Sequence, residues 1–210
     1  MIKLTHLSVM NFENALRGMR NPMNSWERSD SCCELDGYYS LIGPNDLDLA
    51  RRLIKSGSDD RKFLRQIFVS VDILAPLYWW KEYDTYKVGT VANSTSTMHK
   101  IHSKVFTRED FSCERMSDTA LKCLDNTIAV LESCRGFYND SKVQQYWDDM
   151  IQLLPSSYNQ MRTCTLNYEN LLNMYYARRY HKLKEWREFC AWIETLPSFK
   201  EMCLEGDSDA

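Results

Sequence analysis

Glycine and proline are scarce in this sequence, which has 7 Gly and 5 Pro among 210 residues. Disordered and low-complexity chains have the opposite composition, so these classes are excluded. Hydrophobic residues make up 44% of the sequence and aromatic residues 12%. A chain of this length and composition can bury a full hydrophobic core. We therefore predict a single folded domain over residues 1–210.

A strong excess of charge of one sign is also missing, because the formal net charge is -3. Proteins that bind duplexes usually carry a strongly basic face, so binding to polymeric nucleic acid is not expected. No apolar run approaches the roughly 20 residues that span a bilayer. The first residues, Met1 to His6, lack the apolar stretch of a signal peptide. We therefore expect a cytoplasmic protein without a membrane segment.

Paired cysteine motifs are missing as well, although the chain has 8 Cys. None of them forms a C-x-x-C pair, and the adjacent Cys32 and Cys33 have poor geometry for holding one metal ion. Without a signal peptide, thiols are expected rather than disulfides. We predict no metal site and interpret the cysteines as small buried side chains.

The spacing of apolar residues predicts a mixture of strands and helices. The clearest strand spans residues 66–74, where apolar residues alternate with Ser70 and Asp72, and Ala75-Pro76 ends it. A shorter alternation predicts a strand at residues 2–5. Helices are predicted in seven further segments: residues 11–17, 44–56, 77–83, 117–134, 143–154, 167–180 and 184–196.

Two polar segments without periodicity are predicted to be loops. The first runs from Ser25 to Gly43, and long loops in compact domains are often functional, for example in binding a partner protein. The second runs from Asp84 to His99 and contains many small hydroxyl-bearing residues directly after a core element. Such segments commonly face ligands.

The second polar segment carries a known motif in altered form. In one enzyme family, R-H-R-x-x-S-x-N-E-x-S-x-R follows a strand that ends in Ala-Pro or a similar pair. Counting on from Pro76 places Lys81 ahead of the motif, Lys87 at the second Arg of R-H-R, and Thr90 at the first Ser. One residue inserted after Thr90 aligns four more positions with the Asn, Glu, second Ser and last Arg of the motif: Asn93, Ser94, Ser96 and Met98.

A second segment agrees with the same family more closely. Its members carry N-x5-N-x4-R on a helix, shortly before a His and a run of the Q-W-E-I type. This chain has Asn167, Asn173 and Arg178 at that spacing, followed by His181 and Trp186. Taken together, the two segments resemble the flavin-dependent thymidylate synthases.

The resemblance implies an α+β fold in which helices pack on a twisted central β-sheet, and a single thymidylate synthase-like domain. It also implies a homotetrameric flavoprotein of nucleotide biosynthesis, with sites built from several chains. Such a methyltransferase reduces FAD with NADPH and passes a one-carbon unit from methylenetetrahydrofolate to C5 of dUMP or a related pyrimidine nucleotide.

The roles of individual residues follow from the same resemblance. The cofactor-binding positions would be Lys87, Asn93, Asn167 and Asn173. The substrate-binding positions would be Lys81, Thr90, Ser94, Ser96 and Arg178. No catalytic residue is assigned. On a helix, Asn167 and Arg178 would share a face about 16 Å apart, with Asn173 off it, so one ligand touching all three needs a wide cleft or a neighbouring subunit.

Simpler roles stay open for the same residues. Each Asn is also suited to a helix cap or a surface hydrogen bond. Arg178 is also suited to a solvated helix face, or to an ion pair with Glu169 or Glu185.

Three departures from the family pattern affect the nucleotide site. Met98 replaces an Arg, Ser94 replaces a Glu, and Ile151 stands where the family has another nucleotide-binding Arg. Arg162 is a possible substitute for that last Arg. An alternative is therefore a catalytically degenerate homologue that acts as a non-enzymatic nucleotide-binding or interaction protein.

Overall fold

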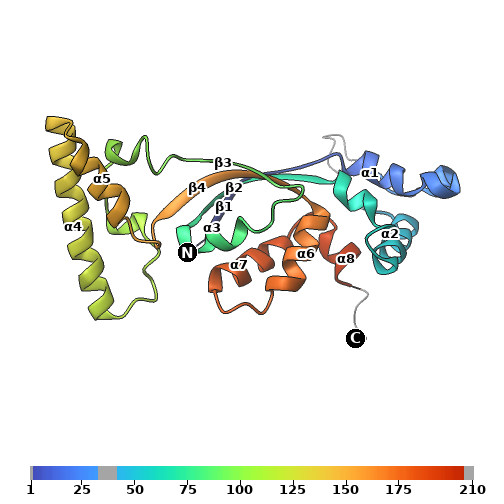
Figure 1. The fold of residues 1–210 in the computed structure, drawn as a ribbon. Helices are drawn as coiled ribbons and strands as arrows, with labels where there is room; N and C mark the ends of the chain where they lie inside the picture. The colour runs from blue at the N-terminus through green and yellow to red at the C-terminus, as the bar shows by residue number, and fades with distance from the viewer. Residues whose placement is uncertain (1, 33–41, 206–210) are drawn as a thin grey trace. The chain divides into compact units, whose positions relative to one another are not determined.

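The computed structural model describes residues 2–32 and 42–205, and it combines helices with a four-stranded antiparallel sheet of strand order β1-β2-β4-β3 (Figure 1). The strands are β1 (Lys3–Met10), β2 (Phe68–Pro76), β3 (Val91–Ser94) and β4 (Asn159–Asn167). The α-helices are α1 (Phe12–Met19), α2 (Pro44–Ser56), α3 (Leu77–Tyr83), α4 (Asp118–Ser141), α5 (Gln144–Leu153), α6 (Tyr168–Arg178), α7 (Lys184–Ile193) and α8 (Phe199–Cys203). Short 3-10 helices are η1 (Asn21–Met23), η2 (Trp26–Arg28), η3 (Lys62–Gln66), η4 (Ile101–Ser103) and η5 (Arg108–Asp110). The predicted mixture of helices and one sheet is confirmed.

Strand β2 follows the predicted alternation. Val69, Val71 and Ile73 are buried, whereas the side chains between them are only half-buried. The strand pairs with β4 in antiparallel fashion, because the Tyr168 amide donates to the Ile67 carbonyl at one end and the Leu77 amide donates to the Tyr158 carbonyl at the other.

Strands β3 and β4 are absent from the sequence prediction. All residues of β3 are exposed, so no hydrophobic pattern marks it, and the prediction of residues 84–99 as loop is wrong at 91–94. Strand β4 has a polar sequence in which only Gln160, Cys164, Leu166 and Asn167 are buried. Hydrogen bonds to neighbouring strands hold these segments in the sheet, and such pairing leaves little trace in one sequence.

The ends of the helices differ from the prediction at a few places. Helix α4 continues to Ser141, beyond the predicted end at residue 134, and none of its last seven residues is buried. Without a buried face, these residues carry no apolar pattern that would have extended the prediction. Helix α8 follows Pro197, where no further element was predicted. The Tyr168 hydroxyl donates to the Pro197 carbonyl (2.8 Å), and Phe199 packs against the Tyr168 ring.

Contacts group the described residues into two compact units. The α4 unit contains residues 2–4, 73–85 and 93–163, and the α6 unit contains residues 5–32, 42–72, 86–92 and 164–205. The single domain over residues 1–210 stays a prediction.

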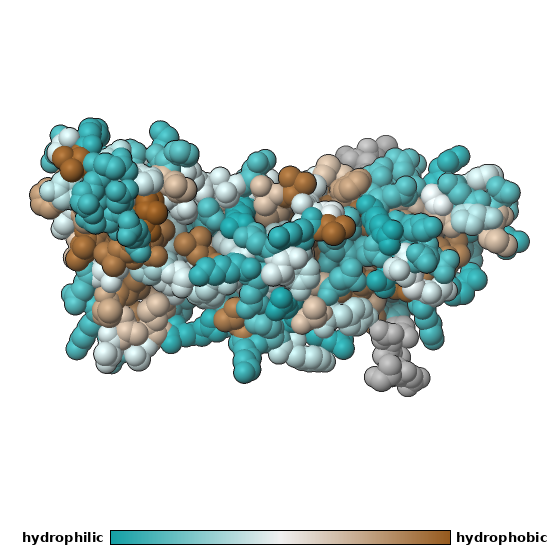
Figure 2. Space-filling model, viewed as in Figure 1, coloured by the Kyte–Doolittle hydropathy of each residue, from teal (hydrophilic) through white to brown (hydrophobic). Residues whose placement is uncertain are grey.

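In the α4 unit, α4 and α5 pack side by side (Figure 1). Leu124, Leu131 and Met150 are buried between these elements. On the face drawn in Figure 2, hydrophobic surface gathers over the same helices. Val130 and Phe137 are exposed apolar residues of α4. Exposed apolar surface of this kind often marks an interface.

In the α6 unit, a buried carboxylate ties the beginning of the predicted Ser25 to Gly43 loop to α2. Asp46 accepts hydrogen bonds from Arg20 Nε (2.6 Å) and from the hydroxyls of Ser29 (2.8 Å) and Ser31 (2.6 Å). Within this loop, residues 26–28 form η2, and residues 33–41 lie outside the described residues. A partner-binding role of the loop stays a prediction.

Two further sequence expectations concern the cysteines and the membrane. The cysteines at positions 32, 113, 123, 134, 164, 190 and 203 are free thiols. Across residues 2–32 and 42–205, no helix has both the length and the hydrophobicity that crossing a membrane requires.

Candidate functional site

Asn167 joins the end of β4 to the beginning of α6. Its Oδ1 accepts a hydrogen bond from the Asn170 amide (3.0 Å), and Asn170 Oδ1 accepts one from the Asn167 amide (3.1 Å). This reciprocal capping box satisfies amide groups that a helix start leaves unpaired. The role of Asn167 as a helix cap is therefore confirmed, and its role in flavin binding stays a prediction.

The turn formed by residues 86–90 lies against this cap. Asn170 Nδ2 donates to the Val88 carbonyl (2.8 Å). Gly89 has a φ of 73°, and a Cβ atom at this position would lie 3.1 Å from Asn167 Nδ2 and 3.1 Å from Asn170 Oδ1. Lys87 and Thr90 flank this glycine, so the structure brings the beginning of the altered motif onto the N-terminus of α6.

Replacing Gly89 with Ala is expected to lower the free energy of unfolding by about 1–3 kcal/mol, because the left-handed conformation is strained for Ala and the added Cβ crowds the capping box. Chemical denaturation of the two proteins measures the difference. Gly136 is a matched control, since it lies inside α4 with no atom near its added Cβ. Gly136→Ala is expected to stabilise the protein by up to about 1 kcal/mol. Equal stability of Gly89→Ala and the original protein would contradict the described turn.

Arg178, in the last turn of α6, is held by two aromatic rings. Its Nε donates to the Tyr86 hydroxyl (2.8 Å), and its guanidinium carbon lies 4.9 Å from the centre of the Trp186 ring. Thr90 Oγ1 donates to the Tyr86 carbonyl. Tyr86 therefore connects two of the predicted substrate-binding residues, and cation–π contact fixes the direction of the Arg178 side chain.

The other predicted residue on α6, Asn173, contacts a group of charged side chains that sequence analysis missed. Glu169 is 8% exposed and pairs with Arg61 (3.1 Å) and with Arg65. Arg61 Nη2 also donates to Asn173 Oδ1 (3.3 Å). Burial alone would raise the pKa of Glu169, but the hydrogen bonds from Arg65 and Arg61 outweigh it and lower this pKa. With one carboxylate and two guanidinium groups, the cluster keeps a net positive charge.

Arg61 and Arg65 left only a weak signal in the sequence. They stand four residues apart, just before β2, and their shared partner follows more than a hundred positions later. A spacing of four residues between cations is typical of many solvated helix faces, so it does not single these residues out.

The remaining predicted residues belong to the α4 unit. Lys81 is exposed on α3, and Asn93 and Ser94 are exposed on β3. Ser96 Oγ accepts hydrogen bonds from the amides of Met98 (3.2 Å) and of the following residue, His99 (2.8 Å). These polar groups are accessible from solvent.

The structure also places Ile151, which departs from the family pattern, and its possible substitute Arg162. Ile151 packs against the hydrophobic cluster between α4 and α5. Its possible substitute, Arg162, pairs with Asp84 (2.7 Å) and lies 4.2 Å from the centre of the Trp80 ring. The Ile151 side chain therefore serves packing, and the Arg162 guanidinium already has contacts inside the α4 unit.

Comparisons with known proteins give a match at the level of structure. No family model matches the chain, and a search of curated proteins finds no match either. The fold matches that of a flavin-dependent thymidylate synthase from Helicobacter pylori complexed with FAD and dUMP, with a TM-score of 0.67, 18% identity and 97% of both chains covered. A second structure of thymidylate synthase X from Helicobacter pylori, with FAD and dUMP, matches with a TM-score of 0.67, 17% identity, and coverage of 97% of this chain and 96% of that chain. The predicted thymidylate synthase-like fold is therefore confirmed.

Proposed function

We propose that this chain is a divergent flavin-dependent thymidylate synthase-like protein that binds FAD and a pyrimidine nucleotide. In this proposal it transfers a one-carbon unit from methylenetetrahydrofolate to C5 of dUMP or a related nucleotide, with NADPH as the reductant. The observation that carries the proposal is the likeness, over 97% of both chains, to a structure that contains FAD and dUMP. The placement of Asn173 and Arg178 on one helix supports it.

The flavin part of the proposal relies on the α6 unit, whose residues fit such a cofactor. Asn173 is exposed, and its amide nitrogen can donate to a ring carbonyl. The net positive charge of Arg61, Arg65 and Glu169 attracts a pyrophosphate group. Lys87 is exposed in the turn over the start of α6 and adds a further cation. FAD, when bound, would supply the redox chemistry.

The nucleotide part relies on groups with different hydrogen-bonding capacity. Arg178 offers a planar fork of donors, which suits a phosphate group. The Thr90 hydroxyl uses its hydrogen on the Tyr86 carbonyl, so it can only accept from a ligand. Ser96 accepts two amide hydrogens and keeps its own hydrogen for donation. Thr90 therefore suits a base N–H, and Ser96 suits a phosphate oxygen. Lys81, Asn93 and Ser94 remain part of the proposed site.

A homotetramer is part of the same proposal. Asn167 and Arg178 lie at opposite ends of α6, a helix about 16 Å long, so a ligand that touches both needs a wide cleft or a site completed by a neighbouring chain. The apolar side chains exposed on α4 and α5, such as Val130 and Phe137, offer a surface for such an assembly.

A catalytically degenerate homologue is the second candidate, and Ile151 favours it. Its apolar side chain is partly buried against the hydrophobic cluster between α4 and α5, and it can offer no cation to a nucleotide phosphate. Met98 is exposed and likewise cannot donate to a phosphate. Such a protein would keep a nucleotide-binding or interaction role without methyl transfer.

The visible absorption spectrum of the purified protein, recorded after loading with FAD and desalting, tests the first proposal. We expect retained flavin with its two visible maxima, and calorimetric binding of dUMP with a Kd on the order of tens of micromolar or tighter. A colourless protein that still binds dUMP would favour the degenerate homologue. Absence of both FAD and dUMP binding would contradict the first proposal and would leave the degenerate homologue only an interaction role.

A further inference from the structure

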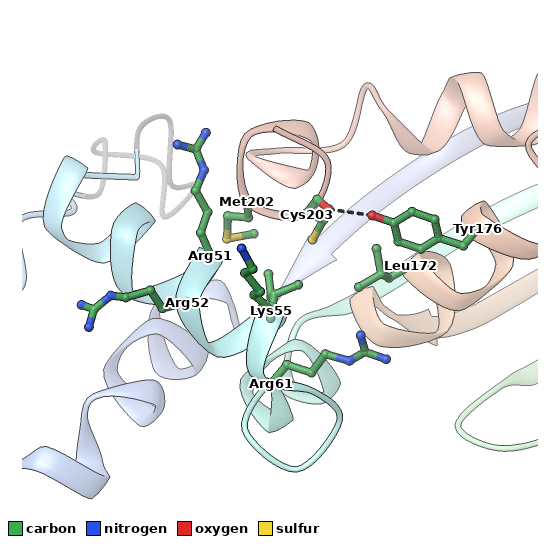
Figure 3. Close-up of a pocket in the computed structure, with 9 residues that line it drawn as sticks. Arg51, Arg52, Lys55, Arg61, Leu172, Tyr176, Met202 and Cys203 are labelled. Atoms are coloured by element: carbon green, nitrogen blue, oxygen red, sulfur yellow. Dashed lines mark hydrogen bonds between the residues drawn. The ribbon is translucent and has the colours of Figure 1, made fainter. Parts of the chain in front are cut away.

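A separate pocket of about 340 Å³ lies in the α6 unit, next to the packed helices α2 and α8 (Figure 3). It is open to solvent on one side and has the size of small-molecule sites in proteins. Its lining comes from α2, from the segment that follows it, from α6 and from α8. The lining residues are Arg51, Arg52, Ile54, Lys55, Arg61, Leu172, Tyr176, Met202 and Cys203.

The described lining of this pocket is rich in positive charge. Among residues 2–32 and 42–205, it includes four cationic side chains and no acidic one. Arg51 is anchored by the Glu201 carbonyl (2.8 Å) and by Glu205 (3.6 Å), and Arg61 is anchored by Glu169. Lys55 differs, because its ammonium group makes no hydrogen bond or ion pair with residues 2–32 and 42–205. Figure 3 shows Lys55 reaching toward Met202, while Arg52 extends away from the other side chains.

The opposite part of the lining is apolar. Leu172 and Met202 are buried, and Ile54 is half-buried. The Tyr176 hydroxyl donates to the Cys203 carbonyl (3.4 Å), which directs the phenol ring along the pocket wall. The Lys55 ammonium group, which has no partner among residues 2–32 and 42–205, therefore stands beside a wall that can accept an apolar or aromatic body.

We propose that this pocket binds a small organic phosphate with an apolar or aromatic body. The cations belong to separate positions on α2 and the segment after it, so the ligand must offer acceptor oxygens in several directions. A phosphate monoester has three such oxygens and carries a charge near -2, whereas a carboxylate has two oxygens in one plane. Apart from Arg61, none of the lining residues belongs to the proposed flavin and nucleotide site, so the inference does not depend on that function.

Phenyl phosphate is a suitable probe, because it combines a phosphate monoester with an aromatic ring. Its binding to the full chain is measured by calorimetry, with inorganic phosphate as a comparison. We expect phenyl phosphate to bind more tightly than inorganic phosphate, and Lys55→Gln to weaken its binding by about tenfold. Lys200→Gln is the matched control, since Lys200 is exposed on α8 but does not line the pocket. This variant is expected to bind phenyl phosphate with unchanged affinity.

Further variants separate this pocket from the proposed function. Arg178→Ala is expected to keep phenyl phosphate binding, and Lys55→Gln is expected to keep FAD binding. If FAD does not bind but phenyl phosphate binds through Lys55, the proposed function fails and the pocket proposal stands. The pocket proposal is overturned if phenyl phosphate does not bind, or if inorganic phosphate binds with the same affinity as phenyl phosphate. It is also overturned if Lys55→Gln binds phenyl phosphate as tightly as the original protein, or if Arg178→Ala loses phenyl phosphate binding.

Discussion

Replacing Asp46 with Asn is expected to lower the free energy of unfolding by about 3–5 kcal/mol. Asp46 is fully buried, and its partner Arg20 has a side chain that is 4% exposed. The variant keeps the shape of the side chain but leaves the Arg20 charge buried without its counter-ion. It also weakens the hydrogen bonds from Ser29 and Ser31 that hold the preceding segment. Urea denaturation followed by circular dichroism measures the loss.

The same carboxylate adds a pH dependence. Burial alone would raise the pKa of Asp46, but hydrogen bonds from Ser31, Ser29 and Arg20 outweigh it and lower the pKa below its ordinary value of 3.8. The stability that ionised Asp46 contributes is therefore fully present above the unfolded-state pKa, and it is lost as the pH falls through the lower folded-state pKa. Asp46→Asn is expected to lack this part of the acid dependence.

Asp48→Asn is the control for this effect, because it removes the same charge from the same helix. Asp48 is 68% exposed and pairs with Arg52 four residues later. An exposed pair of this kind contributes about 0.3–0.5 kcal/mol. If Asp46→Asn costs no more than Asp48→Asn, the description of a buried ion pair that holds residues 29–31 is wrong.

Replacing Arg178 with Ala is expected to weaken dUMP binding by about ten- to hundredfold, which is the range for loss of hydrogen bonds to a charged group. The fork of Arg178 is already oriented by Tyr86 and Trp186, so little ordering is needed on binding. Arg178→Lys is expected to recover only part of the affinity, because a Lys keeps the charge without the fork. Calorimetric titration with dUMP compares these variants.

Arg179→Ala serves as the control for Arg178. Arg179 is exposed at the C-cap of α6, and its guanidinium carbon lies 5.1 Å from the centre of the Tyr176 ring. Its replacement removes an equal charge and is expected to leave dUMP affinity within about twofold of the original. Unchanged dUMP affinity in Arg178→Ala would remove Arg178 from the proposed site.

Strands with a buried face could be predicted from the sequence, and strands without one could not. Residues 66–74 alternate because one face of β2 enters the core, and this periodicity is local. Strand β3 has no buried face, and β4 contains polar residues on both faces. Their positions depend on pairing with strands that are distant in sequence, which no local pattern records.

The candidate site shows the same limit. The helix predicted over residues 167–180 is confirmed as α6, with Asn167 as its N-cap and Arg178 in its last turn. The residue type of Asn167 suited both a helix cap and a surface hydrogen bond, and the structure shows the cap. The contacts of Glu169 with Arg61 and Arg65 could not be foreseen, because they join segments that are separated by more than a hundred residues.

The capping box also fixes which hydrogen-bonding groups a ligand can present to Asn167. Its carbonyl oxygen is directed to the Asn170 amide, so the group left to face a ligand is the amide nitrogen, a donor. Gly89 lies close to that nitrogen, because a Cβ atom at this position would be only 3.1 Å from it. A ligand atom that meets Asn167 must therefore carry a lone pair, as a ring carbonyl or a phosphate oxygen does. An N–H group at the same place would face another hydrogen-bond donor, and the side chain could not turn over to accept it without breaking the start of α6.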